Sequence, residues 1–143
     1  MTSTESAATK PQLITPTFVL AWVANFCQFL VFYLSVTTMA LYAVESFGAS
    51  DTVGGFASSA FVLGATCMRV FSGWIVDRVG HKKAALTSLA FVTVVAVAYF
   101  FAHNVAVLII VRMVHGAGYA LTSTALMAVA QSVIPHERRA EGT

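Results

Sequence analysis

The stretch Gly73-Trp74-Ile75-Val76-Asp77-Arg78-Val79-Gly80-His81-Lys82-Lys83 decides the fold, because it places an acid, two glycines and a basic cluster between two long apolar runs. Residues 52–76 lead into the charged part and carry a single charged side chain, Arg69, whereas residues 84–111 follow it without any. A charged turn this short between two runs of membrane-spanning length predicts a tight loop at a membrane surface.

The composition is typical of a membrane protein. Of the 143 residues, 58% are hydrophobic and 10% are charged, whereas soluble domains carry about 25% charged residues. Four apolar runs, residues 17–44, 52–76, 84–102 and 105–134, are long enough to cross a bilayer. The bilayer offers no hydrogen-bond partners to the backbone, so continuous apolar runs without strict alternation predict helices. We therefore expect an all-α membrane protein with four transmembrane helices.

Basic side chains outside these runs indicate the orientation of the helices. All of them fall on one side of the alternating topology, and the connections at residues 45–51 and 103–104 contain no Lys or Arg. Because loops rich in Lys and Arg stay in the cytoplasm, we predict a multi-pass protein of the inner or plasma cell membrane, with a disordered cytoplasmic tail at residues 1–14. The residues that set this orientation are Lys10, Arg78, Lys82, Lys83, Arg138 and Arg139.

Small side chains recur at every fourth position of the last apolar run. Gly116, Ala120 and Thr124 begin this series, and Gly64 belongs to a shorter one in the second run. Residues four apart share one helix face, and small residues let two backbones approach closely. The pattern favours a packed helix–helix face, although small residues are also common in membrane helices generally.

A polar stripe within the last run is the sharpest indication of function. Arg112, His115 and Tyr119 are spaced three and four residues apart and share one helix face. Burying a charge at the bilayer centre costs at least about 2.5–3.5 kcal/mol, so the stripe needs protein or a water-filled cavity in front of it. Asn25 and Gln28 form a weaker stripe in the first run, which either faces the same cavity or joins helices by hydrogen bonds.

Arg69 allows two interpretations. It lies eight residues before Asp77, which is about 12 Å along a helix. Its long side chain could extend toward the inner membrane surface while its stem stays in the apolar region. Alternatively, it takes part in a gate on the cytoplasmic side.

Two of these motifs resemble those of major facilitator superfamily transporters. The loop between the second and third helices of that superfamily has the pattern G-x-[LI]-x-D-R-x-G followed by basic residues, and here His81 replaces a usual Arg or Lys. The segment from Arg112 to Gly118 is similar to the fourth-helix pattern R-x-x-x-G-x-G, with His115 where Gln is frequent. The residues that match the loop pattern are Gly73, Ile75, Asp77, Arg78, Gly80, Lys82 and Lys83.

The resemblance implies secondary active transport of a small solute by alternating access, of the efflux type. It further implies a gating loop at Gly73, Asp77, Arg78, Gly80, Lys82 and Lys83, and a pathway lined by Arg112, His115, Tyr119, Asn25 and Gln28. Transporters of this superfamily usually have twelve helices. We therefore expect residues 15–143 to be a partial transporter domain, a fragment whose partners include the missing C-terminal helices, the lipid bilayer, a small-molecule substrate and protons.

Other functions are less well supported. The four runs contain no Asp or Glu, so an antiporter mechanism has only Arg112 and His115 here to handle protons, or groups elsewhere. No nucleophile lies beside a base, and the histidines lack metal-ligand spacing, so we expect no enzyme, cofactor, metal site or nucleic-acid partner. The alternative is a stand-alone four-helix membrane protein, acting as a homo-oligomeric small exporter or as a scaffold without transport.

Overall fold

The computed structural model describes residues 14–135, which form four long helices and one short 3₁₀ turn, without strands in that range. All four helices are long and apolar enough to cross a membrane. The expected all-α class is thus confirmed. In chain order the elements are α1 (Pro16–Phe47), α2 (Asp51–Val79), α3 (His81–Ala98), η1 (Tyr99–Phe101) and α4 (Val105–Ser132).

Side-chain caps begin three of the helices. A hydroxyl or amide oxygen accepts a hydrogen bond from the backbone N–H three residues later, which satisfies one of the free donors at a helix start. The α1 helix ends at Gly48, whose positive φ of 61° is the usual helix-terminating conformation for glycine. Short connections of this kind make consecutive helices antiparallel. The capping residues are Thr15, Ser50 and Asn104, with donor–acceptor distances of 3.2, 3.4 and 2.9 Å.

The corner between α2 and α3 is tighter than the sequence suggested. We expected a loop from the end of the second apolar run to Lys83, but α2 continues to Val79 and α3 begins at His81. Gly80 alone lies outside a helix, with a φ of 93° that favours glycine. Its N–H still donates to the Val76 carbonyl at 2.9 Å. The charged side chains of the corner therefore stand on two helix ends and not on a loop.

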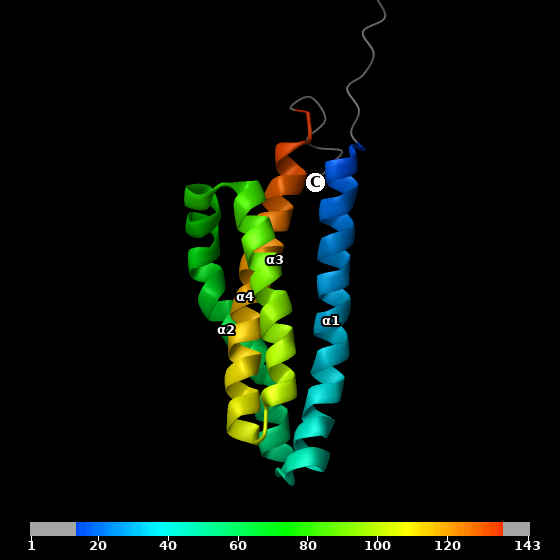
Figure 1. Ribbon diagram of the computed structural model, residues 1–143, viewed down its shortest axis with the longest axis vertical. Helices are drawn as coiled ribbons and strands as arrows, with labels where there is room; N and C mark the ends of the chain where they lie inside the picture. Colours follow the sequence, from blue (N-terminus) through cyan, green and yellow to red (C-terminus); the bar gives the residue numbers. More distant parts are fainter. Residues whose placement is uncertain (1–13, 136–143) are drawn as a thin grey trace, which may run out of the picture.

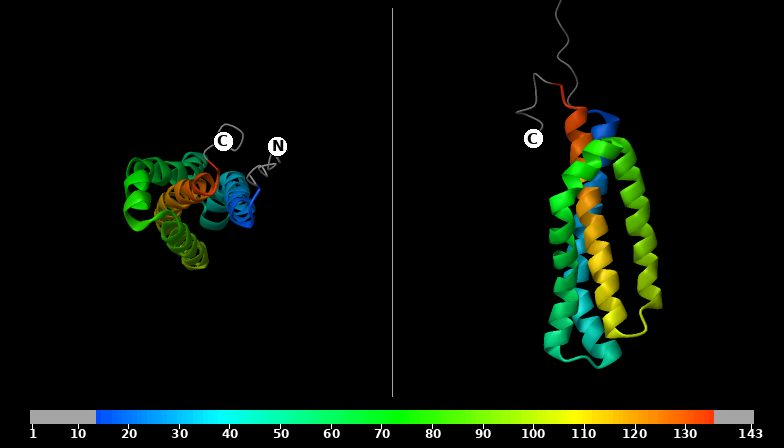
Figure 2. Two further views of the ribbon diagram at one scale, coloured as in Figure 1. Left: turned by 90° about the horizontal axis from the view of Figure 1, so that it is seen from above. Right: turned by 90° about the vertical axis from the view of Figure 1, so that its left-hand side faces the viewer.

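The α4 helix lies in the middle of the arrangement and contacts each of the other three helices. Figure 1 shows the start of α1, the α2–α3 corner and the end of α4 at one end of the bundle, with the α1–α2 and α3–α4 connections at the other. Seen from above in Figure 2, α1, α2 and α3 surround α4. The first of these ends is called the corner end below.

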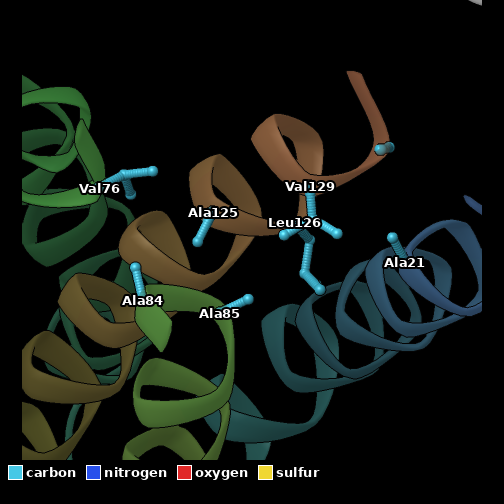
Figure 3. Packing of buried hydrophobic residues seen from close by; sticks show 8 residues of the cluster. Ala21, Val76, Ala84, Ala85, Ala125, Leu126 and Val129 are labelled. Carbon is cyan, nitrogen blue, oxygen red and sulfur yellow. The ribbon is translucent and has the colours of Figure 1, made fainter. Parts of the chain in front are cut away.

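The packed interior is built mostly from small side chains. At the corner end, eight buried residues from all four helices form one cluster, in which Ala125 of α4 is fully enclosed (Figure 3). In contrast, large apolar side chains cover the outside, and Val70, for example, is 77% exposed. Such a distribution suits helices whose outer faces contact lipid. The cluster comprises Ala21, Val76, Ala84, Ala85, Ala125, Leu126, Val129 and Ala130.

The α2 and α4 helices approach each other so closely that their backbones touch. A Cβ atom placed on Gly64 would collide with the Met113 backbone carbonyl, and one placed on Gly116 would collide with the Phe61 carbonyl. Only glycine fits at these two positions. Ala120, one turn further along α4, is also fully buried.

We predict that Gly116→Ala lowers the free energy of unfolding by about 1–3 kcal/mol, the usual cost of an added methyl group in a filled interior. The measurement is chemical denaturation of the purified protein in detergent micelles. Gly55→Ala in α2 is the matched control, because a Cβ there would meet nothing within 4 Å. That control should be neutral or stabilising, since Ala favours helix over Gly. Equal effects of both substitutions would contradict the close α2–α4 contact.

Candidate functional site

Arg112 is the most completely buried charged side chain among residues 14–135, with 0% of its surface exposed. Its Nε atom donates to the Ala57 carbonyl at 3.2 Å, and its Nη2 atom donates to the Ser58 carbonyl at 2.7 Å. The guanidinium carbon lies 5.2 Å from the centre of the Phe61 ring, within the range of a cation–π contact. Carbonyl dipoles of α2 and an aromatic face thus stabilise this charge in place of a carboxylate.

Among the described helices Arg112 lies in a helix contact and not in the wall of a groove, although we expected it to line the pathway. Because α2 and α4 touch through Gly64 and Gly116, the side chain reaches the α2 backbone and is enclosed there. The contact extends further, since the Ser58 hydroxyl donates to the Val36 carbonyl of α1 at 2.6 Å. Arg112 therefore joins α4 to α2, and Ser58 joins α2 to α1.

His115 follows Arg112 on the same face of α4 and is also buried. Its Nδ1 atom is 3.0 Å from the Tyr99 hydroxyl, at the end of α3, and its ring packs edge-on against Phe61 at 5.3 Å between centres. Sequence reasoning missed Tyr99, because its partner lies on another helix, sixteen residues away. This hydrogen bond joins the third and fourth helices.

A first groove lies between α1 and α3, with His115 at its base. It has a volume of about 380 Å³ and is lined mainly by apolar residues of both helices, including Val31 and Val92. Gln28 and Thr93 are polar side chains of its wall. We call it the α1–α3 groove. It brings together two of the residues expected in the pathway, Gln28 and His115.

A second groove lies between α1 and α4, toward the corner end, and we call it the α1–α4 groove. It has a volume of about 360 Å³ and is lined by residues of α1, α2 and α4. Asn25 and Tyr119, both expected in the pathway, lie in its wall, together with Arg69 of α2. The Oδ1 atom of Asn25 is buried and has no hydrogen-bond partner within residues 14–135. The other polar lining residues are Ser123, Thr124 and Gln131.

The expected pathway residues thus occupy three places and not one cavity. Asn25 and Gln28 are three residues apart on α1, which separates them by about 60° around the helix axis. They consequently line different grooves. On α4, Tyr119 packs with its ring against Phe32 and Phe61, at 5.8 and 5.3 Å between centres.

The residues expected to mediate helix packing lie at the α2–α4 contact. Gly64 and Gly116 form the backbone approach described above, and Ala120 is buried beside it. The Thr124 hydroxyl lies 3.1 Å from the Ser72 hydroxyl of α2 and also donates to the Ala120 carbonyl. Thr124 therefore contributes both to packing and to the wall of the α1–α4 groove.

The expected gating residues stand on the α2–α3 corner and are exposed, apart from the partly covered Gly80. An Asp77 oxygen lies 3.9 Å from the His81 Nε2 atom, one helical turn away across Gly80. The Arg78 guanidinium lies 4.8 Å from the centre of the Trp74 ring. Gly73 would meet nothing within 4 Å if it carried a Cβ atom, so none of the described helices packs there. Lys82 and Lys83 complete the basic group.

The family model of the Major Facilitator Superfamily matches residues 21–143. This match covers most of the chain, and the chain therefore belongs to the Major Facilitator Superfamily, a superfamily of membrane transporters. It is accordingly a multi-pass membrane protein of a transporter family, and the stand-alone four-helix alternative is not favoured. Comparisons with curated proteins and with solved structures gave no match.

We predict that Arg112→Met lowers the free energy of unfolding by about 2 kcal/mol or more, because hydrogen bonds from charged donors contribute about 1.5–3 kcal/mol each. Denaturation in detergent micelles measures this change. Arg112→Lys should recover only part of the loss, because a single ammonium cannot reproduce the two-pronged contact with Ala57 and Ser58. A methionine variant as stable as the parent protein, but inactive in transport, would instead favour a role in the pathway.

Proposed function

We propose that this chain moves a small solute across the cell membrane by alternating access, as an efflux-type permease. The observation that carries the proposal is the pair of grooves beside α1, whose largely apolar walls include the polar side chains of Gln28, His115, Asn25 and Tyr119. Polar groups at membrane depth are costly and are kept where they face protein or a water-filled path. Because the chain belongs to a superfamily of transporters, we interpret such a path as the route of a transported solute.

The proposed path is lined by the residues that face the two grooves. Asn25 and Tyr119 would contact the solute in the α1–α4 groove, and Gln28 and His115 would do so in the α1–α3 groove. The buried Arg112 holds α2 and α4 in register and does not contact the solute. His115 is the imidazole in these walls, and we assign proton coupling to it.

The α2–α3 corner is proposed as the cytoplasmic gate. Asp77 lies in the last turn of α2, where the helix dipole disfavours a negative charge. The carboxylate is therefore stabilised when it meets a cation or the start of another helix, and it is exposed enough to do so. Gly80 sets the corner, while Arg78, Lys82 and Lys83 hold it at the anionic inner surface. Alternate making and breaking of the Asp77 contact would then open and close this side.

The four helices are proposed to contact the cytoplasm, further helices and the lipid bilayer. The basic corner end is assigned to the cytoplasm, together with the N-terminus, by the positive-inside rule. The gate needs a partner for Asp77 beyond the corner, and we assign this partner to further helices of the same transporter. The lipid bilayer contacts the apolar outer faces.

Flux through the reconstituted product of the complete gene tests this function. A panel of small solutes of different charge is loaded into vesicles, and their release is followed with and without a proton gradient. We predict that Asp77→Asn lowers the flux by about tenfold or more, because the amide cannot form the charged contact of the gate. Glu45→Gln, at the opposite end of the bundle, is the control and should retain the parent flux. Absence of flux for every solute would refute transport, and full flux in Asp77→Asn would refute the gate.

Orientation is tested separately by thiol labelling in intact cells. After replacement of Cys27 and Cys67 by Ala, a single cysteine is placed at position 81 or at position 103, at opposite ends of the bundle. We predict that an impermeant maleimide reaches His103→Cys from outside, and reaches His81→Cys only after permeabilisation. The reverse pattern would place the corner end outside the cell.

A further inference from the structure

We propose that the α1–α4 groove binds the negatively charged group of an organic anion, and that Arg69 supplies the positive charge. This inference rests on the proposed transport function and names the class of substrate. It also gives Arg69 a third role, distinct from extension to the inner surface and from a gate, the two that its place in the sequence allows.

The charge in the lining of the groove is of one sign, positive. Among residues 14–135, Arg69 is its only charged lining residue, and the lining contains no acid. Within residues 14–135, the Arg69 side chain forms neither an ion pair nor a hydrogen bond with another residue. The other arginine at membrane depth, Arg112, is enclosed between helices and donates through Nε and Nη2 to the Ala57 and Ser58 carbonyls. A guanidinium that has no partner among the described residues, beside apolar walls, favours an anion with two acceptor oxygens, such as a carboxylate, sulfonate or phosphonate.

The shape and lining of the groove favour a small amphipathic molecule. Its volume of about 360 Å³ lies in the range of small-molecule sites, about 300–1,000 Å³. Phe29 and Met127 supply apolar and aromatic surface, while Asn25, Ser123 and Gln131 supply hydrogen-bonding groups. The unpartnered Oδ1 atom of Asn25 provides a further acceptor for a polar substituent. A phenyl-sized body with one anionic group fits these features.

The depth of Arg69 argues for a solute rather than a lipid headgroup. The residue lies eight positions before Asp77 on α2, which places it about 12 Å further into the membrane than the charged corner. Arg78 and Trp74, close to the corner, are better placed for headgroups. Lining residues from three different helices also enclose the site more than a headgroup contact on one helix would.

The test uses three probes that share one ring and differ in charge: benzenesulfonate, neutral benzenesulfonamide and the cation phenyltrimethylammonium. Equilibrium binding is measured on the complete gene product in nanodiscs of pure phosphatidylcholine. We expect benzenesulfonate to bind best and Arg69→Gln to weaken its binding by about tenfold or more. Arg69→Lys should weaken it less than Arg69→Gln does, because the ammonium keeps the charge but not the paired donors. Because Arg69 is exposed on the described helices, neither variant should unfold, and thermal denaturation checks this.

Three results would overturn the proposal. One is equal affinity of the parent protein and Arg69→Gln for benzenesulfonate. Another is a preference for the amide or the cation. The third is a dependence on Arg69 that appears only when phosphatidylglycerol is added, which would identify a lipid headgroup as the occupant. Flux of the same probes is measured in vesicles, so that binding without flux would refute transport while the anion site remains, and flux of cations alone would refute the anion site while transport remains.

Discussion

The contact of α2 with α4 at Gly64 and Gly116 is the constraint on which the rest of the structure depends. A membrane interior contains no water to satisfy a buried guanidinium, so Arg112 has to find acceptors within the protein. Helical carbonyls are normally occupied by their own helix, but each has a second lone pair that a side chain can use. Arg112 reaches those of Ala57 and Ser58 only because the two backbones touch at the glycines. Because Gly64 and Gly116 have no side chains, the two helices come close enough for the charge of Arg112 to be buried between them.

This contact fixes the position of α4 and thereby determines which of its faces meet α1 and α3. With one face of α4 held against α2, the adjoining faces remain for α3 and α1. The Tyr99–His115 hydrogen bond joins α3 to α4 on one side, and the stacked rings of Phe32 and Tyr119 join α1 to α4 on the other. The grooves beside α1 are the spaces left between these contacts. One polar stripe on a single helix therefore supplies an interhelical contact, the base of one groove and the wall of another.

Much of the fold follows from the sequence, because length and polarity determine it. Apolar runs of membrane-spanning length predict the four helices, and Gly80 predicts the reversal between two of them. The extent of that corner was misjudged, since Asp77, Arg78 and His81 are as compatible with helix ends as with a loop, and a single glycine suffices to turn the chain.

The site was harder to predict, for a physical reason. Periodicity shows which residues share a face of one helix, but it does not show which neighbour that face meets. The partners of Arg112 are backbone carbonyls, which every residue has and which the sequence therefore does not identify as partners. Without a recognisable partner, Arg112 was assigned to an open path. Tyr99 was missed for a related reason, since its partner belongs to another helix. Asn25 and Gln28 were grouped by spacing, yet a rotation of about 60° places them on different sides of α1.

The two arginines at membrane depth illustrate how the same side chain acquires different roles. Both occur in apolar runs, and neither has a carboxylate nearby within residues 14–135. Arg112 points into a contact where α2 carbonyls accept from its Nε and Nη2 atoms and the Phe61 ring lies close, while its buried Nη1 atom has no hydrogen-bond partner within residues 14–135. Arg69 lines a groove whose other polar groups are neutral, so its charge is balanced by nothing in the wall. In a medium of low dielectric constant, an unbalanced charge acts over longer distances than in water. We therefore propose a structural role for the fully enclosed arginine and solute recognition for the more accessible one.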